Sequence, residues 1–549
     1  MNAAELFVQC LENEGVRRVF GVPGEENAAL LLALDASTID FVLTRHEQGA
    51  AFMAEVHGRL TGEPGVCLGT LGPGATNLVT GVANANMDRV PLIAITGQAG
   101  IERWHKESHQ AMDVVGMFKP ITKWASTILT PHNVPEVVHK AFKLAAAEKS
   151  GACHIELPED VASQPADHLD PITKSRPTRP VPDRDVIFAA LQVIRSAKSP
   201  VILAGNGVIR HGASTELRKF AETTGIGVIN TFMAKGVISL DSVYSLFTIG
   251  LQAKDLVFRA IYDADLVITV GYDMVEYPPK LWNPDREKKI IHLDFVPAEV
   301  DENYRVEIEV IGDLSHALQM LNDGIHDNPF SIDPTRQHAV RHEMMNEISA
   351  YENDDTKGPM RPQKILADVR KALGPADILL SDVGAHKMWV ARQYQCYEPN
   401  TCLIPNGFAS MGFALPGSIS AAMIDDSRKV MAIAGDGGFL MNVQEMETAR
   451  RLGSDIVVMV WEDGGYGLIE WKQDNIYGGH TDLSFGNPDW GKLADSFGWS
   501  YDYVDESPKL LGTIEKALDT AGPSLIVVPI DYRENAILTR RLGEIAMGL

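Results

Sequence analysis

The stretch AIAGDGGFLMNVQEME, residues 432–447, joins an apolar run to a glycine-rich turn that carries one acid, Asp436. The apolar run has the length of a buried strand, and the segment after the turn has the composition of a helix. The next apolar run, DIVVMVWEDGGYG, reaches Asp463, 27 residues after Asp436. That separation is typical of one strand–helix–strand unit, which joins parallel strands. The pattern therefore predicts two carboxylates at neighbouring strand ends.

Apolar runs that end in glycine turns recur along the 549 residues and alternate with amphipathic segments. This alternation predicts an α/β protein of three consecutive domains, each an open, mostly parallel sheet flanked by helices. We expect the domains at residues 1–165, 183–325 and 360–549, because the segments between them are rich in proline and charge. The predicted strands are a run before GVPGEEN, then VCLGTLGPG, PLIAITG, ACHIELPED, PVILAGNG, IGVINTF, DLVITVGYD, IIHLDF, DILLSDVG, KVMAIAGDGG, DIVVMVWEDGG and SLIVVPIDY.

The composition, 45% hydrophobic and 22% charged, is that of a folded soluble protein. A formal net charge of −24 argues against nucleic acid and anionic membrane surfaces as partners. The five cysteines lack the spacing of a zinc site or a disulfide framework. The N-terminal residues lack the basic region and apolar core of a signal peptide, and no apolar run reaches about 18 residues. We therefore expect a cytoplasmic protein.

The acid pair has two interpretations. Asp436 and Asp463 could simply be solvated at the edge of a sheet, where their charges repel one another. Two carboxylates beside the amides of Gly437 and Gly438 also suit a hard divalent cation that bridges to a diphosphate. Mg²⁺ fits this interpretation, because it needs few protein oxygens when phosphates supply others.

Other glycine turns give weaker signals. The turn at residues 72–74 opens a predicted helix and could hold an anion at its backbone amides. Glu47 lies near the start of another predicted helix, where a carboxylate complements the helix dipole without any catalytic role. In AGNGVIRHG the glycines at 205, 207 and 212 miss the spacing of a dinucleotide-binding turn, so we do not expect a nicotinamide enzyme.

A GDG sequence followed about two dozen residues later by an Asn or Asp resembles the thiamine diphosphate binding motif. The segments RHEQGAAFMA, GPGATN, SDVGAHKMW and NGFASMGFALPG are also similar, in order and spacing, to segments of the acetolactate synthases. The resemblance covers essentially the whole chain. It implies a pyrimidine-binding N-terminal domain, a central domain and a C-terminal domain that binds the diphosphate.

The resemblance also implies a role for individual residues. Asp436, Asp463 and the carbonyl of Gly465 would bind Mg²⁺, and Glu47 would bond to the pyrimidine and activate the cofactor. Met411 would hold the cofactor in its bent shape, with the carbonyl of Ala409 accepting from its amino group. The further cofactor-binding residues implied are Asn77, Gly384, Ala385, His386, Gly435, Gly437, Gly438 and Tyr466. Because the family forms its site between subunits, at least a homodimer is implied, and we expect a homotetramer.

Two segments indicate the branch of the family. ESHQAMDVVGMFKPITKWA resembles the substrate-side segment of acetolactate synthases and places Gln110 at the reacting group. VGYDMVEYPPKLWNP resembles the catabolic branch, which works without flavin, so we expect no FAD. The resemblance then implies a carboligase that decarboxylates pyruvate and adds the hydroxyethyl unit to a second 2-oxo acid, giving 2-acetolactate and CO₂.

Lys472 departs from the catabolic pattern, which has a glutamine near the acceptor substrate at this position. A lysine could anchor the acceptor carboxylate or change which acceptor fits. A second function is therefore a 2-oxo acid decarboxylase that releases aldehydes, although the chain has no HH pair of the kind that pyruvate decarboxylases use. A flavin-dependent pyruvate oxidase is a third, and a cofactor-binding protein without activity is a fourth.

Overall fold

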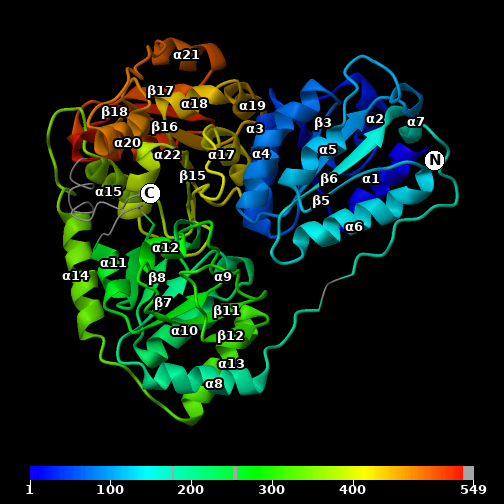
Figure 1. The fold of residues 1–549 in the computed structure, drawn as a ribbon. Coiled ribbons are helices and arrows are strands. Elements are labelled where there is room, and N and C mark those ends of the chain that lie inside the picture. Colours follow the sequence, from blue (N-terminus) through cyan, green and yellow to red (C-terminus); the bar gives the residue numbers. More distant parts are fainter. Residues whose placement is uncertain (176–177, 251–255, 536–549) are drawn as a thin grey trace.

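The computed structural model describes residues 1–175, 178–250 and 256–535. Within them the chain forms three sheets of six parallel strands each, with helices on their faces (Figure 1). The predicted α/β class with three successive parallel sheets is confirmed. None of the helices among these residues is long and apolar enough to cross a lipid bilayer.

The N-terminal sheet has the strand order β2-β1-β3-β4-β6-β5. Its central strands are buried along their whole length, as expected of a parallel sheet covered on both faces. The strands are β1 (Arg18–Gly21), β2 (Asp40–Leu43), β3 (Gly65–Gly69), β4 (Leu92–Gln98), β5 (Trp124–Thr127) and β6 (Ala152–Pro158). The helices are α1 (Ala3–Glu14), α2 (Ala28–Asp35), α3 (Glu47–Thr61), α4 (Pro73–Met87), α5 (Val114–Phe118), α6 (Val134–Ala146) and α7 (Glu159–Ala162).

The central sheet has the order β12-β11-β10-β7-β8-β9. Residues 176 and 177, in the predicted link before this domain, lie outside the described residues. The strands are β7 (Pro200–Ala204), β8 (Val228–Asn230), β9 (Ser245–Thr248), β10 (Leu266–Val270), β11 (Lys289–Asp294) and β12 (Ile308–Ile311). The helices are α8 (Arg184–Ser196), α9 (Gly207–Arg210), α10 (Ser214–Thr224), α11 (Leu256–Tyr262), α12 (Pro279–Trp282), α13 (Leu314–Asp327) and α14 (Thr335–Ser349).

The glycines of AGNGVIRHG bring two loops of the central domain into direct contact. The amide of Gly207 donates to the carbonyl of Gly271, at 2.8 Å. A Cβ at Gly205 would lie 2.4 Å from the same carbonyl oxygen, so a larger residue would not fit there. These glycines therefore serve loop packing.

The C-terminal sheet has the order β14-β13-β15-β16-β18-β17. Strands β15 and β16 pair in parallel from Val430 and Ile456 to Gly435 and Trp461. The strands are β13 (Ile378–Ser381), β14 (Cys402–Leu403), β15 (Val430–Gly435), β16 (Ile456–Glu462), β17 (Ser500–Tyr503) and β18 (Ser524–Pro529). The helices are α15 (Pro362–Ala372), α16 (Ala385–Gln393), α17 (Ala414–Ile424), α18 (Asp436–Met441), α19 (Glu445–Leu452), α20 (Gly467–Tyr477), α21 (Trp490–Phe497) and α22 (Ser507–Leu518). Residues 536–549 of the predicted domain lie outside the described residues.

Helix α3 joins the N-terminal and C-terminal domains, because it packs against α4 on one side and α17 on the other (Figure 1). The rings of Phe52 and Phe413 meet edge to face, with centroids 5.7 Å apart. The Ser420 hydroxyl donates to the Met53 carbonyl at 2.7 Å. One continuous apolar core therefore runs through both domains and fixes their relative position.

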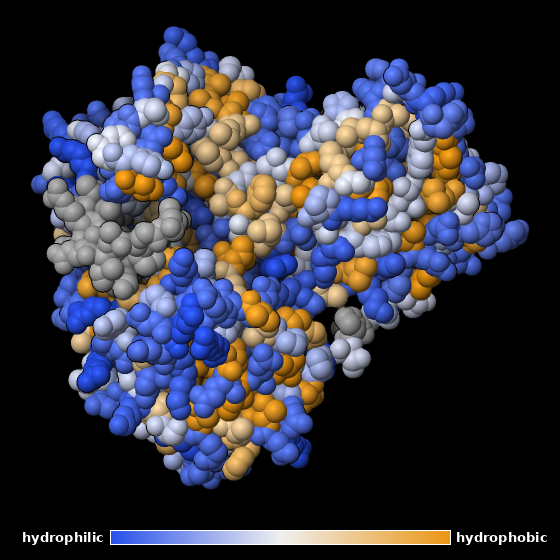
Figure 2. Space-filling model, viewed as in Figure 1, coloured by the Kyte–Doolittle hydropathy of each residue, from blue (hydrophilic) through white to orange (hydrophobic). Residues whose placement is uncertain are grey.

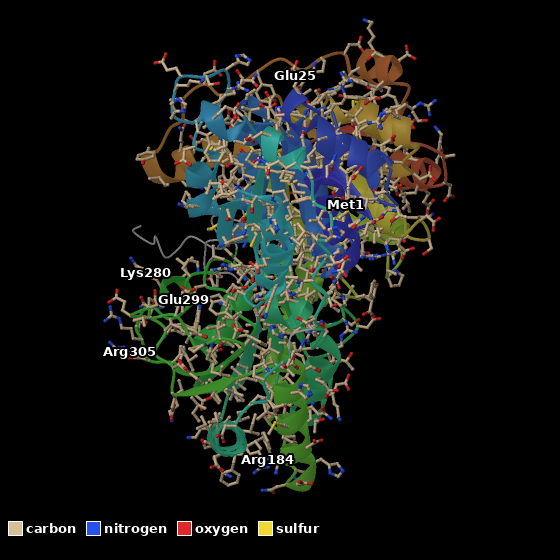
Figure 3. The ribbon with its side chains drawn as sticks, turned by 90° about the vertical axis from the view of Figure 1, so that its right-hand side faces the viewer. Met1, Glu25, Arg184, Lys280, Glu299 and Arg305 are labelled. Carbon is tan, nitrogen blue, oxygen red and sulfur yellow. The ribbon has the colours of Figure 1, made fainter. Side chains whose placement is uncertain are left out.

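The surface differs between the seam of these two domains and the rest of the molecule. Figure 2 shows apolar atoms gathered where the C-terminal and N-terminal domains adjoin, while hydrophilic residues cover most of the remaining face. In the turned view of Figure 3 the central domain lies below the other two, and Lys280, Glu299 and Arg305 project from its edge.

The strands that the sequence did not predict are all at sheet edges. They are β2 and β5, β9 and β12, and β14 and β17. Strand β14 has two residues, and β2 and β17 are largely exposed or half-buried. A short strand with one paired side carries neither the long apolar run nor the clear alternation that sequence patterns detect.

The close contact of α3 and α4 can be tested at Gly81. A Cβ at Gly81 would lie 2.4 Å from Cβ of Ala51. We expect Gly81→Ala to lower the free energy of unfolding by about 1–3 kcal/mol, because overpacking outweighs the gain in helix propensity. Gly512→Ala is the matched control: nothing lies within 4 Å of that position in α22, so we expect a gain of about 0.5–1 kcal/mol. Denaturant unfolding of both variants measures the two changes in the free energy of unfolding. A gain in both variants, or a loss in both, would contradict the packing argument.

Candidate active site

The two predicted carboxylates lie side by side at the carboxyl ends of β15 and β16. Asp436 is 1% exposed, and its Oδ2 accepts from the amide of Gly464 at 2.7 Å and from that of Asp463 at 3.3 Å. Its Oδ1 accepts from the amide of Gly437 at 2.8 Å. The side chain is therefore fixed by the backbone of both turns.

Asp463 lies in an environment that disfavours its negative charge. Burial first, and the neighbouring Asp436 second, raise the pKa of Asp463 to about 7. A divalent cation between the two carboxylates would remove this penalty. No group of three or more His, Cys, Asp or Glu side chains in the described parts of the chain is arranged to hold a metal ion. A cation here would thus use two carboxylates together with a backbone carbonyl and oxygens of a ligand.

The neighbouring turns form a cradle with little side-chain volume. The His386 ring lies 3.3 Å from where a Cβ at Gly435 would lie, and a Cβ at Gly437 would lie 3.0 Å from the Tyr466 ring. Burial lowers the pKa of His386 to about 3, so this imidazole is neutral, and its buried Nε2 has no hydrogen-bond partner. Backbone amides and an unpaired imidazole nitrogen beside two acids fit a phosphate group that arrives with a cation. His386 follows Gly384 and Ala385, so the structure brings the predicted C-terminal residues together.

Asn487 belongs to this cluster, although the sequence did not predict it. Its Nδ2 donates to Oδ2 of Asp436 at 2.8 Å and to Oε1 of Glu462 at 3.2 Å. Its Oδ1 is buried without a hydrogen-bond partner. Asn487 lies in a segment without regular structure between α20 and α21, so no strand end or helix start in the sequence pointed to it.

A second cluster lies at the starts of α3 and α4 in the N-terminal domain. Glu47 is the first residue of α3, is 7% exposed, and accepts at Oε2 from Nδ2 of Asn77, at 2.9 Å. Gly74 leaves room beside it, because a Cβ there would lie 3.3 Å from Oε1 of Glu47. Gln110 is exposed next to the same turn, where a Cβ at Gly72 would lie 2.9 Å from Cβ of Gln110. The structure thus groups three of the predicted residues.

The loop with Ala409 and Met411 lies on the C-terminal domain beside the acid cluster. Ala409 has φ of 59°, a left-handed conformation that is uncommon for a residue with a side chain. The amide of Gly412 donates to Oδ1 of Asp382 at 2.9 Å, and burial raises the pKa of Asp382 to about 6. The sequence analysis did not predict Asp382. Its position directly after β13 is the same strand-end signal that indicated Asp436.

Lys472 is exposed on α20, a helix without buried residues. It lies close enough to Lys387, in the first turn of α16, to disfavour the charge on that lysine. Burial mainly, with a smaller contribution from Lys472, lowers the pKa of Lys387 to about 8. The two ammonium groups lie on helices that begin in segments predicted to bind the cofactor.

The two clusters are not joined within one chain. Across the described ranges of the structure, no hydrogen bond or ion pair connects Glu47 with Asp436, Asp463 or Lys472. Apolar side chains near the acid cluster and its loop are open to solvent, with Phe408 47%, Met441 44% and Tyr466 39% exposed. The two halves of the predicted site thus lie on different domains without a direct contact.

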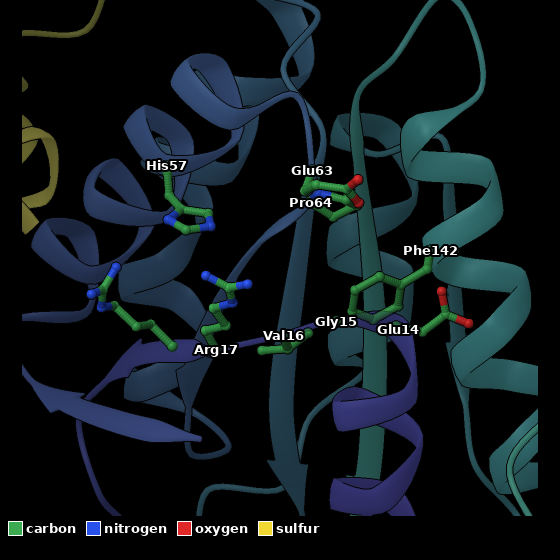
Figure 4. A pocket seen from close by; sticks show the side chains of 9 residues that line it. Glu14, Gly15, Val16, Arg17, His57, Glu63, Pro64 and Phe142 are labelled. Carbon is green, nitrogen blue, oxygen red and sulfur yellow. The ribbon is translucent and has the colours of Figure 1, made fainter. Parts of the chain in front are cut away.

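Neither of two cavities coincides with these clusters. One of about 580 Å³ lies between the N-terminal and central domains, and one of the four arginines that line it, Arg210, pairs with Glu148 and Asp273. The other, of about 20 Å³, has room for about one water. Figure 4 shows that small pocket between His57, Arg17 and Phe142.

The chain matches three family models in sequence order. They are described as the thiamine pyrophosphate enzyme N-terminal TPP binding domain, at residues 1–117, the central domain, at 187–321, and the C-terminal TPP binding domain, at 382–528. Each match covers all or most of the strands of one sheet, the N-terminal, the central and the C-terminal sheet in turn.

Curated relatives are similar over nearly the full length. An acetolactate synthase of Bacillus subtilis is 35% identical over 97% of this chain and 94% of its own. A catabolic acetolactate synthase of Raoultella terrigena is 33% identical over 98% of this chain and 97% of its own. A probable acetolactate synthase large subunit of Methanocaldococcus jannaschii is 34% identical over 97% of this chain and 93% of its own.

The repulsion at the acid pair gives a pH-dependent prediction for metal-free protein. The pKa of Asp463 is about 7 in the folded chain and about 4 when unfolded, so its ionisation destabilises the fold progressively between those pH values. We expect Asp463→Asn to raise the thermal midpoint by roughly 3 °C at pH 8, and by less at pH 5. Asp495→Asn, at an exposed position, should leave the thermal midpoint unchanged at both pH 8 and pH 5. A gain from Asp463→Asn that does not grow with pH would contradict this account.

Proposed function

The chain belongs to the acetolactate synthase group of thiamine pyrophosphate enzymes, and on that premise we propose that it converts two molecules of pyruvate to 2-acetolactate and CO₂. The observation that carries the proposal is the pair of Asp436 and Asp463 at adjacent strand ends, where Asp436 is buried and Asp463 is exposed. That pair suits Mg²⁺ bound to a diphosphate. The choice of reaction is supported by the whole-length similarity to acetolactate synthases.

The chain offers a binding group for each end of thiamine diphosphate. We propose that Asp436, Asp463 and the carbonyl of Gly465 bind Mg²⁺. The diphosphate would be held by the segments with Gly384, Ala385 and His386, and with Gly435, Gly437, Gly438 and Tyr466. The pyrimidine end would be held by Glu47, Asn77, Ala409 and Met411. The functional domains would be residues 1–165, 183–325 and 360–549.

Bound thiamine diphosphate supplies the electron sink for decarboxylation of a 2-oxo acid. The role we propose for Glu47 is to hold and return a proton at N1′ of the pyrimidine. Its Oε2 is held by Asn77, which leaves Oε1 for this exchange. The buried position supports the role, because removal from water strengthens such a hydrogen bond. Gln110 and Lys472 would face the substrates.

The separation of the two clusters supports a homodimer. Glu47 and the acid pair lie on different domains without a direct contact, so we propose that Glu47 of one chain completes the acid cluster of a second chain. The exposed apolar side chains of Phe408, Met441 and Tyr466 support this proposal, because a second copy would cover them. We propose a tetramer as a pair of such dimers, in the cytoplasm.

We propose that FAD is not bound, and the carboxyl edge of the central sheet supports this. Lys149 pairs with Asp273 at 2.8 Å, and Arg210 pairs with Asp273 at 2.9 Å and with Glu148 at 2.7 Å. These groups are mostly buried and neutralise one another. The glycines of the adjoining loop are also used in packing. Buried ion pairs and packed glycines do not fit a flavin nucleotide at this edge.

Exchange of Glu47 tests the proton role. We expect Glu47→Gln to lower turnover at least about 100-fold, because an amide cannot carry the proton to N1′. Thiamine diphosphate should still bind, which quenching of tryptophan fluorescence measures. Glu136→Gln is the matched control, since Glu136 is an exposed acid in the first turn of α6, and should leave turnover unchanged. Near-normal turnover in Glu47→Gln would contradict the proposed role.

Product analysis tests the reaction itself. With pyruvate, Mg²⁺ and thiamine diphosphate, we expect 2-acetolactate as the main product by chiral chromatography. The position of Lys472 favours a second candidate, a decarboxylase of longer 2-oxo acids, which would release aldehydes instead. Lys472→Gln should change the ratio of products formed with 2-oxobutyrate as a competing acceptor. Acetaldehyde as the sole product from pyruvate would exclude the carboligase.

A further inference from the structure

We propose that Asp88, together with Asn84, is a positioning residue that holds the loop of residues 406–411 in the shape that receives thiamine diphosphate. The proposal rests on the function proposed above for Ala409 and Met411. Both positioning residues belong to the N-terminal domain, whereas the loop belongs to the C-terminal domain of the same chain.

Two side chains at the end of α4 accept hydrogen bonds from the loop backbone. Oδ1 of Asp88 accepts from the amide of Gly407 at 2.6 Å, and Oδ2 accepts from that of Asn406 at 3.2 Å. One turn earlier, Oδ1 of Asn84 accepts from the amide of Ser410 at 3.2 Å. Both side chains are buried, Asn84 at 0% and Asp88 at 1% exposure. Three of the loop's amides thus depend on the end of one helix.

The loop backbone lies directly on that helix end. A Cβ at Gly407 would lie 2.6 Å from the carbonyl oxygen of Met87 and 2.8 Å from Oδ1 of Asp88. The side chain of Asn406 reaches a third partner, because its Nδ2 donates to the carbonyl of Glu276 at 3.2 Å. The loop is therefore fixed where all three domains meet.

An acid at the end of α4 is locally unfavourable, so it needs another explanation. A helix C-terminus carries partial negative charge, which repels a carboxylate. Burial raises the pKa of Asp88, and Arg59 and the amides of Gly407 and Asn406 oppose that rise. The guanidinium of Arg59 also donates to the carbonyl of Ile404, just before the loop, at 3.1 Å. Asp88 thus faces the loop amides together with the cations Arg59 and Lys387, and Arg59 itself bonds to the segment before the loop.

The contacts hold the loop while leaving its centre open. The amides of Asn406, Gly407 and Ser410 bond to the end of α4, and that of Gly412 bonds to Asp382. Between them Phe408 is 47% exposed, and Ala409 and Met411 are half-buried. Ala409 keeps its left-handed backbone only if the surroundings fix it. Loss of the Asp88 contacts should therefore release Ala409 and Met411.

Asp88 acts at a different place from the Glu47 cluster. Asn77, the partner of Glu47, lies 11 residues before Asp88 on the same helix, which is roughly 16 Å along the axis. An effect of Asp88 on cofactor binding would therefore come through the loop.

Hydrogen exchange in cofactor-free protein tests the loop contact directly. We expect Asp88→Ala to exchange the amides of peptides covering residues 404–412 at least about tenfold faster, because their acceptors are lost. Asp88→Asn should give an intermediate rate, since its amide oxygen can still accept from Gly407. Asp35→Ala removes an exposed acid at the end of α2 and should change nothing. Unchanged exchange in Asp88→Ala would overturn the proposal.

A pair of ligands tests the consequence for binding. We expect Asp88→Ala to weaken thiamine diphosphate at least about tenfold in titration calorimetry with Mg²⁺, and Asp88→Asn to weaken it less. Inorganic diphosphate with Mg²⁺ should bind within about twofold of wild type, because it does not reach the loop. Equal losses for both ligands would mean general damage and would overturn the proposal. If Asp88→Ala does not fold, the same comparison in Asp88→Asn decides.

One further variant separates this proposal from the function on which it rests. Asp436→Ala should lose both thiamine diphosphate and inorganic diphosphate. If Asp436→Ala binds thiamine diphosphate like wild type, the proposed cofactor site is wrong. If Asp436→Ala loses both ligands while Asp88→Ala binds thiamine diphosphate normally, the positioning role alone is wrong.

Discussion

Repulsion between two neighbouring carboxylates, one buried and one exposed, is the constraint around which the C-terminal domain is built. Asp436 and Asp463 lie at adjacent strand ends, and the fold holds them together although burial and their like charges oppose it. The backbone of both turns and the amide of Asn487 fix Asp436 in place. Such an arrangement stores an unfavourable energy that a bound cation relieves. The glycine turns around it then have the space that a diphosphate needs.

The rest of the fold serves to place other groups around this pair. Helix α3 begins with Glu47 and continues into the core that the N-terminal and C-terminal domains share. Helix α4 bonds to Glu47 near its start, through Asn77, and to the loop of Ala409 and Met411 near its end. Two helices of the N-terminal domain thus set both the proposed activating acid and the loop that we propose to receive the cofactor. A single chain nevertheless leaves Glu47 apart from the acid pair.

The sequence predicted what lies in the middle of each sheet and missed the edges. Inner strands such as β15 and β16 are long apolar runs ending in glycine, whereas the edge strands β14 and β17 are short or exposed. The same distinction holds in the site. Asp436 and Asp463 follow neighbouring strands, so their spacing indicated them, whereas Glu47 starts a helix and only the resemblance to acetolactate synthases pointed to it. Asn487 and Asp88 act through contacts between distant segments, Asp88 across 318 and 319 residues, which no local pattern records.

The acceptor site shows why similarity alone leaves substrate choice open. Lys472 lies on a helix without buried residues, so packing does not restrict its identity, and a change there costs the fold little. Its electrostatic effect is nevertheless felt at Lys387, which burial has already made a weaker cation. An acceptor carboxylate near both ammonium groups would offset their repulsion, whereas a neutral aldehyde would not. Lys472, which packing does not restrict, is therefore the residue that we propose to influence the choice of the second substrate.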